Sequence, residues 1–147
     1  MKSVWQPAVR SELKSRLAKL RPNQTPGWGK FTAGQMVVHI SDSFRSSIGE
    51  LTIKSRGGPF RYSPLKQLII YWVPFPRNLP TAPELLARQP GEWRADVDEL
   101  TALVDRFATR DRVGTWPDHG AFGRMTGDQW GVLMYRHTDH HFRQFGI

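Results

Sequence analysis

Hydrophobic residues recur at helical spacing along much of the chain, and the alternation typical of β-strands is almost absent. Residues 7–20 and 92–108 show the pattern most clearly, because each repeats apolar side chains three and four positions apart. Such residues lie on one side of an α-helix, so both stretches predict amphipathic helices. The polar side of the second helix is expected to hold four acidic residues that face solvent: Asp96, Asp98, Glu99 and Asp105.

Two further helices are predicted from capping signals. Thr32 stands three residues before Gln35, and Thr126 stands three residues before Gln129. In a capping box the Thr side chain accepts a hydrogen bond from the backbone three residues on, while the Gln side chain bonds back. We therefore expect helices from Thr32 to about Ile48, where Gly49 follows, and from Thr126 towards Gln144.

The stretch between these helices has a different composition. Seven of the 11 prolines lie between Pro59 and Pro90, so residues 51–90 are predicted to be irregular. A short helix at 64–73 and a brief one starting at Thr81 are expected inside it. The sequence thus predicts one all-α domain over residues 1–147, a four-helix bundle with a long proline-rich crossover between its second and third helices. Long connections of this kind often form lids or binding walls.

Composition narrows the possible functions. The chain has 147 residues, of which 39% are hydrophobic. It contains no cysteine, which excludes disulfides and thiolate ligands. No run approaches the ~20 apolar residues of a membrane span, and the N-terminus lacks an apolar signal core. We therefore expect a cytoplasmic protein without a membrane partner.

The net charge of +8 is uneven along the chain. Residues 1–83 hold 13 Lys and Arg and three acids, whereas residues 84–147 hold eight Arg and ten acids. A basic half can attract nucleic acid, anionic lipid or an anionic substrate, but we favour a solvated basic face. Since no RNA-binding signature, Cys-His finger or basic zipper is present, we do not expect a nucleic-acid partner.

The last predicted helix carries the strongest chemical signal. His137 and His141 are four residues apart and share a helix face with Trp130 and Met134. Two imidazoles on a buried face need polar partners, and a shared cation would satisfy both. The alternative is a pair of core histidines that are hydrogen-bonded to the backbone or to side chains.

The other three histidines have less distinctive surroundings. His140 lies roughly 100° from His141 on the helix wheel, so we expect it to support the site, to line a pocket rim or to be exposed. His119 lies in a Gly-rich loop and is expected at the surface or as a loop anchor. His39 lies beside the apolar face of its helix with polar neighbours such as Asp42, which suits either the margin of a cavity or exposure.

Several motifs together resemble the DinB-like superfamily of bacterial four-helix proteins, and in particular a branch of uncharacterised function. The resemblance covers nearly the whole chain, except that residues 51–90 match only in their proline content. It rests on these segments: Trp28-Gly29, Gln35 to Ile40, Phe122 to Thr126, Trp130-Gly131 and His137 to Gly146.

The resemblance implies an up-down-down-up bundle with a divalent metal bound by His39, His137 and His141. Zinc or nickel is the expected ion, since imidazole suits both. Gln144 matches the end of the family motif and, with Asp42 and His140, is a candidate to support the ligands or line the pocket. The resemblance also implies a homodimer, a small-molecule substrate and a low-molecular-weight thiol used with the metal. Relatives of this kind are thiol-dependent S-transferases or isomerases, and a metal-dependent thiol S-transferase is the activity we expect.

Two alternatives stay open at this point. A metal hydrolase would use bound water in place of a thiol, and a non-catalytic binding module would use the basic N-terminal half as its working surface. Under the enzyme hypothesis, four basic residues of the crossover are candidates to recognise an anionic cosubstrate, although a solvated loop is the simpler interpretation: Lys54, Arg56, Arg61 and Arg77.

Overall fold

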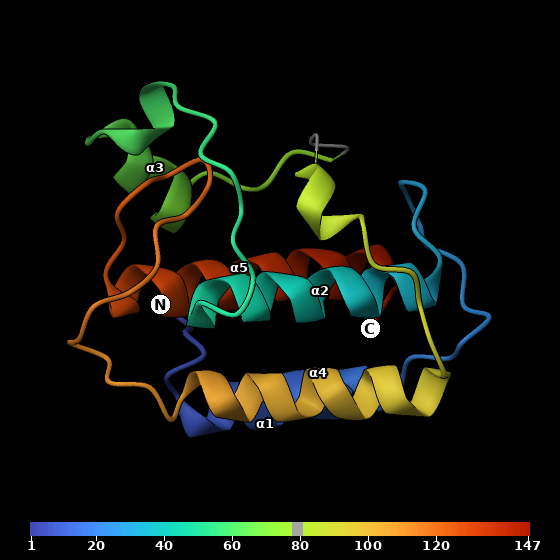
Figure 1. Cartoon of the computed structure of the whole chain (residues 1–147). Helices are drawn as coiled ribbons and strands as arrows, with labels where there is room; N and C mark the ends of the chain where they lie inside the picture. The colour runs from blue at the N-terminus through green and yellow to red at the C-terminus, as the bar shows by residue number, and fades with distance from the viewer. Residues whose placement is uncertain (78–80) are drawn as a thin grey trace.

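A computed structural model describes residues 1–77 and 81–147. Its four long helices form two layers, with α2 and α5 in one and α1 and α4 in the other (Figure 1). Their bounds are α1 Pro7–Leu17, α2 Ala33–Ile48, α4 Trp93–Phe107 and α5 Gly127–Gln144. In the described part of the chain no strand forms, and the predicted all-α bundle is confirmed.

The direction of the helices explains the long crossover. In Figure 1, α1 and α5 run from left to right, whereas α2 and α4 run from right to left. Since α2 has 16 residues and the neighbouring α4 is parallel to it, the chain must return about 24 Å to the end where α2 began. The return carries the short helix α3 (Leu65–Tyr71) between two 3₁₀ turns, η1 (Pro59–Arg61) and η2 (Pro83–Leu85).

The capping signals set the ends of the two helices that carry the histidines. The hydroxyls of Thr32 and Thr126 accept hydrogen bonds from the backbone N–H groups of Gln35 and Gln129, and both Gln side chains bond back. Gly49 ends α2 with a φ of 88°, a left-handed conformation that costs glycine little. The predicted capping boxes are therefore confirmed.

A single apolar core lies between the two layers. Its largest fully buried side chains come from all four long helices and include Leu13, Phe44, Phe107 and Trp130. This packing, more than helix propensity, holds α2 and α5 at a fixed separation. Among the described residues, no helix is both long enough and apolar enough to cross a membrane.

Some predicted details were wrong. Helix α1 ends at Leu17 and α3 covers only Leu65–Tyr71, because turns and the prolines around them end the hydrogen-bond ladder. The helix expected from Thr81 is only the η2 turn. Asp96 does not face solvent: it is 8% exposed and accepts a hydrogen bond from the backbone N–H of Gly91.

Candidate metal centre

Three histidines that are distant in sequence meet between α2 and α5. The Nε2 atom of His137 lies 3.1 Å from Nε2 of His39 and 3.2 Å from Nε2 of His141. The antiparallel arrangement of the two helices brings the first half of α2 beside the last turns of α5. We refer to His39, His137 and His141 as the histidine cluster, and their potential ligand atoms all lie within 4.8 Å of one another.

The outer nitrogens of two of these rings have acceptors. Nδ1 of His141 donates a hydrogen bond to the side-chain oxygen of Gln144 at 2.8 Å, and the Gln144 amide in turn donates to the carbonyl of Trp28. Nδ1 of His39 lies 3.4 Å from the carbonyl oxygen of Leu85. Both rings therefore carry their proton on Nδ1 and direct the lone pair of Nε2 into the cluster.

The three inner nitrogens cannot satisfy one another by hydrogen bonding alone. Nε2 of His137 can donate one proton to one neighbour, which leaves the other lone pair of the cluster without a donor. A cation accepts all three lone pairs at once. Nitrogens that bind a tetrahedral zinc ion at 2.0–2.1 Å are about 3.3 Å apart. The two nitrogen pairs that include His137 are close to this spacing, and all the potential ligand atoms lie within 4.8 Å of one another. The donor set thus fits a divalent ion with three imidazole ligands.

The surroundings keep the cluster uncharged. Burial lowers the pKa of His39 to about 4, and the Leu85 carbonyl and Asp42 counteract this only in part. Burial also lowers the pKa of His141 to about 3, assisted by repulsion from His39. The pKa of His137 is lowered well below its usual value by burial and by both other rings. Neutral imidazoles are the form that binds metals.

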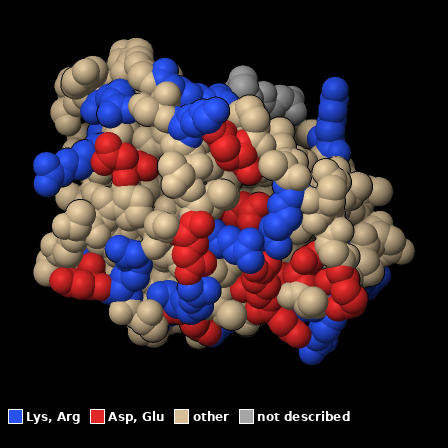
Figure 2. All heavy atoms as spheres, viewed as in Figure 1, with Lys and Arg blue, Asp and Glu red and all other residues tan. Residues whose placement is uncertain are grey.

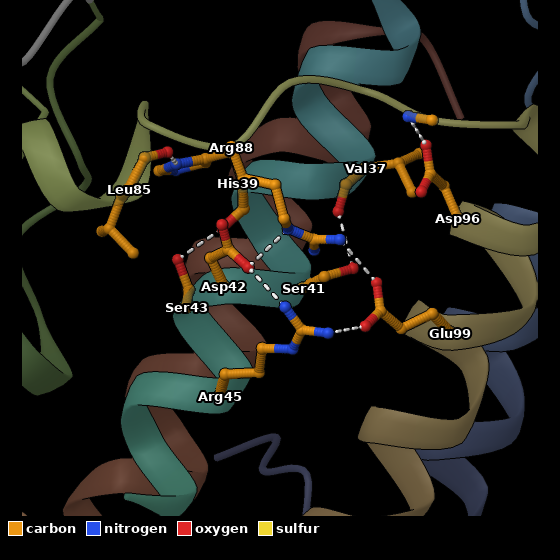
Figure 3. A network of polar contacts seen from close by, with 11 residues as sticks. Val37, His39, Ser41, Asp42, Ser43, Arg45, Leu85, Arg88, Asp96 and Glu99 are labelled. Atoms are coloured by element: carbon orange, nitrogen blue, oxygen red, sulfur yellow. Dashed lines mark hydrogen bonds and ion pairs between the residues drawn. The ribbon is translucent and has the colours of Figure 1, made fainter. Parts of the chain in front are cut away.

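A network of ion pairs fastens the crossover to α2 and α4 beside the cluster (Figure 3). Arg88 donates from Nε to Asp42 at 3.0 Å and from Nη1 to Glu99 at 2.9 Å. Arg45 contacts the same two carboxylates from the neighbouring turn of α2. Since Arg88 lies three residues after Leu85, this network holds the segment whose carbonyl faces His39.

The histidine cluster opens into a cavity of about 670 Å³, which we call the main cavity. Apolar and aromatic side chains from the loops and from α5 form most of its wall, including Trp28, Phe31, Phe75, Leu85, Leu133 and Met134. The ring of Phe31 lies against His39 and His141, and the ring of Phe75 lies against His137. Among the described residues that line the main cavity, none is acidic, and the two basic ones, Lys30 and Arg56, are exposed.

The supporting residues predicted from sequence have different positions. Gln144 contacts His141 directly, as expected for a residue that orients a ligand. Asp42 has no hydrogen bond to His39 and pairs with Arg88 instead, and it is the carbonyl of Leu85 that lies opposite Nδ1 of His39. His140 lines the cavity rim between Trp28 and Phe75.

The remaining candidates are dispersed. Of the four basic crossover residues, Arg56 is the one that lines the main cavity in the described part of the chain. Arg77 lies over the ring of Trp28 in a neighbouring groove, and Arg61 donates to Ser55. His119 anchors its loop, which is one of the two positions predicted for it from the sequence. It also lines the main cavity.

Sequence reasoning missed the groups that the crossover contributes. The carbonyl of Leu85 has no sequence signal, since every residue carries a carbonyl. Arg88 and Phe75 belong to a proline-rich stretch whose path cannot be derived from periodicity. The proline content of 51–90 was the available hint, because long irregular connections often build binding walls.

The fold and the cluster together define a four-helix protein with a histidine-rich site between its second and last helices. A family comparison matches residues 8–145 to the DinB superfamily. The chain belongs to this superfamily. No curated protein and no solved structure matches the chain.

We expect Arg88→Met to weaken the binding of added Zn²⁺ about 10- to 100-fold, the usual cost of disturbing a residue that supports a ligand. The reason is that the Leu85 carbonyl loses the ion pairs that hold it near His39. Competition with a chromogenic chelator would measure the affinity. Arg94→Met is the matched control, because Arg94 forms only an exposed pair with Asp98. Equal affinities in the two variants would contradict the assigned role.

The metal-free protein should lose stability as the pH falls from about 6.5 towards 4. His39 takes up a proton near pH 6.5 when unfolded but only near pH 4 when folded, so the unfolded state binds more protons in this range. Each such histidine contributes a slope of about 1.4 kcal/mol per pH unit. Urea unfolding at several pH values between 6.5 and 5, where carboxylates stay ionised, would measure this slope of the free energy of unfolding against pH.

His39→Gln should reduce that slope by roughly the contribution of one histidine. The comparison isolates His39 from His119, whose pKa burial also lowers to about 4. An unchanged slope in the variant would show that His39 does not stay neutral in the folded protein.

Proposed function

We propose that this protein binds one divalent metal ion through His39, His137 and His141 and catalyses the transfer of a low-molecular-weight thiol to a small electrophile. The observation that carries the proposal is the convergence of three Nε2 atoms at the wall of an apolar cavity. A divalent ion held there supplies a Lewis acid that lowers the pKa of a thiol or a water in an open coordination position.

The residues around the ion have separate tasks in this proposal. Gln144 and the Leu85 carbonyl hold the outer protons of His141 and His39, and so keep both Nε2 atoms free for the metal. Phe31 and Phe75 cover the cluster and exclude water, which strengthens electrostatic interactions inside the site. In the transfer itself, a bond forms between the thiol sulfur and an electrophilic carbon. The leaving group departs with its electron pair, and the thiol proton passes to solvent.

A thiol suits this cavity better than water does. Metal hydrolases of the HExxH pattern place a glutamate beside the bound water as a general base. Within residues 1–77 and 81–147, the lining of the main cavity holds no Asp or Glu. A thiol, with an ordinary pKa near 8.5, needs less assistance to ionise than water. This difference favours the transferase over the hydrolase.

The basic N-terminal half gives less support to a binding module for polyanions. On α1, Lys14 and Arg10 pair with Asp105, and Arg16 pairs with Asp139. On the face shown in Figure 2, acidic and basic side chains are interspersed over the layer that contains α4. Neighbouring acids reduce the field that would attract nucleic acid. A homodimer and a cytoplasmic location stay predictions from the sequence.

Purified without a histidine tag, the protein should contain close to one equivalent of zinc or nickel. His137→Gln should lose most of it, because the central ligand of the cluster is removed. His140→Gln is the matched control: the residue is adjacent on α5 but lies at the cavity rim, so its metal content should be unchanged. Elemental analysis after gel filtration would measure the metal content of the wild type and of both variants. A wild-type protein that is purified without metal and takes up no added zinc would refute the site.

The metal-loaded protein should consume a bacterial low-molecular-weight thiol when it is supplied with an aromatic or alkyl electrophile. Monochlorobimane provides a fluorescent readout for a panel that includes cysteine, glutathione and the cysteinyl sugar thiols. His137→Gln should lower the rate at least 100-fold, a typical loss when a group that activates a nucleophile is removed. Metal binding without turnover of any thiol would support the metal site and contradict the transferase proposal.

A further inference from the structure

A second polar group faces the main cavity from the loop that precedes α5. His119 and Gly123 exchange two backbone hydrogen bonds of 2.8 Å each, which closes a tight turn between them. The backbone of Gly120 packs against Ile53 and Lys54 so closely that a Cβ atom would lie 2.9 Å from the Ile53 side chain. The position of the His119 side chain is thus fixed by backbone contacts on both sides.

The tautomer of His119 is also fixed. Its Nδ1 atom accepts hydrogen bonds from the backbone N–H groups of Ala121 and Phe122, both at 3.1 Å. An atom that accepts two N–H donors carries no proton, so the proton of the neutral ring lies on Nε2. Burial, with repulsion from Lys66, lowers the pKa of His119 to about 4 and keeps the ring neutral at physiological pH.

No hydrogen bond to the Nε2–H group of His119 is formed within the described part of the chain. The group is not one of the fully buried atoms that lack a partner, and His119 is partly exposed, so a ligand can reach it. The ring stacks on Phe122 with centroids 4.7 Å apart and lies 5.3 Å from the ring of Trp130. Both aromatic residues line the main cavity together with His119. Since His119 lines the main cavity, a ligand in that cavity can provide an acceptor for this donor.

The distance between this donor and the histidine cluster limits the size of the ligand. Trp130, which lies beside His119, and His137 are seven residues apart on α5, about 10 Å along the helix axis. The wall between them is apolar, with Leu133 and Met134 on α5 facing the same cavity. A molecule that reaches both ends therefore has an apolar body several carbon atoms long.

The charge of the lining limits the ligand further. The main cavity presents the exposed Lys30 and Arg56 and no acidic side chain among its described residues. A neutral or anionic oxygen is compatible with these groups. An ammonium group finds no carboxylate there, and only the lone pairs of the metal-free histidine cluster could accept its protons.

We propose that the Nε2–H of His119 forms a subsite for an acceptor oxygen, a carbonyl or carboxylate, of an apolar small molecule whose other end lies at the histidine cluster. The inference rests on the proposed function only in taking that molecule as the substrate. Binding to His119 itself does not require the metal, so the two proposals can fail separately.

Three probes of equal length distinguish an acceptor oxygen from an ammonium group on the same apolar body: 4-phenylbutanoate, 4-phenylbutanamide and 4-phenylbutylamine. The carboxylate and the amide should bind to both the metal-free and the zinc-loaded protein. The amine should bind at least 10-fold more weakly than the amide to the zinc-loaded protein, in which the metal occupies the lone pairs of the histidine cluster. Calorimetry or ligand-observed NMR would give the dissociation constants. Equal binding of the amine and the amide to the zinc-loaded protein would overturn the acceptor subsite, whereas failure to take up zinc would affect only the metal proposal.

His119→Asn is the informative variant. The Asn side-chain oxygen can take the place of Nδ1 and accept from Ala121 and Phe122, so the turn is kept. The NH₂ group of the Asn then lies at the former position of Cδ2, so the donor at the position of Nε2 is lost. Both oxygen probes should bind about 10-fold more weakly to the variant, while the affinity of the amine stays the same. An unchanged affinity for the oxygen probes would overturn the proposal.

A measurement on the wild type keeps the test valid if the variant does not fold. The imidazole nitrogens of ¹⁵N-labelled His119 should show the Nε2–H tautomer, and 4-phenylbutanoate should shift the Nε2 signal more than the Nδ1 signal. The Nδ1–H tautomer, or an Nε2 signal that does not respond to a probe that binds, would overturn the subsite.

Discussion

The interaction on which the site depends is the convergence of three imidazole lone pairs in surroundings that disfavour their protonation. His39 and His141 each hold a proton on the outer nitrogen, because the Leu85 carbonyl and Gln144 accept it there. The inner nitrogens then face His137 at 3.1 and 3.2 Å. Burial prevents the cluster from relieving this crowding by protonation, since charged imidazoles would lose their hydration. A divalent cation is the partner that satisfies all three rings.

The topology of the bundle builds the cavity around this cluster. Because α2 and α4 are parallel, the chain between them must cross the length of the bundle, and it does so on the side where α2 and α5 lie (Figure 1). The crossover supplies Phe75 to the wall and the Leu85 carbonyl to His39. Arg88 then fastens the same segment to Asp42 and Glu99. A connection that topology requires therefore also acts as the support and cover of the site.

The main cavity has two polar ends that differ in chemistry. The histidine cluster offers lone pairs, which suit a cation, whereas His119 offers an N–H group, which suits an acceptor. The difference arises from the hydrogen bonds of the outer nitrogens: Nδ1 of His141 donates to Gln144, but Nδ1 of His119 accepts from two backbone N–H groups. The same side chain is thereby set to opposite roles by its immediate partners.

The sequence by itself determined the elements whose signals are local. Apolar periodicity and capping boxes predicted α2, α4 and α5, and the spacing of His137 and His141 placed both imidazoles on one helix face, because side chains four residues apart lie one above the other. His39 was ambiguous from its neighbours, and the resemblance to a family singled it out.

Only the tertiary structure decided that His39 meets the other two, that Leu85 and not Asp42 faces its ring, and that His119 borders the same cavity. These contacts join residues far apart in sequence through irregular segments, whose path depends on side-chain packing and on ion pairs such as Arg88 with Asp42, and not on any repeating pattern.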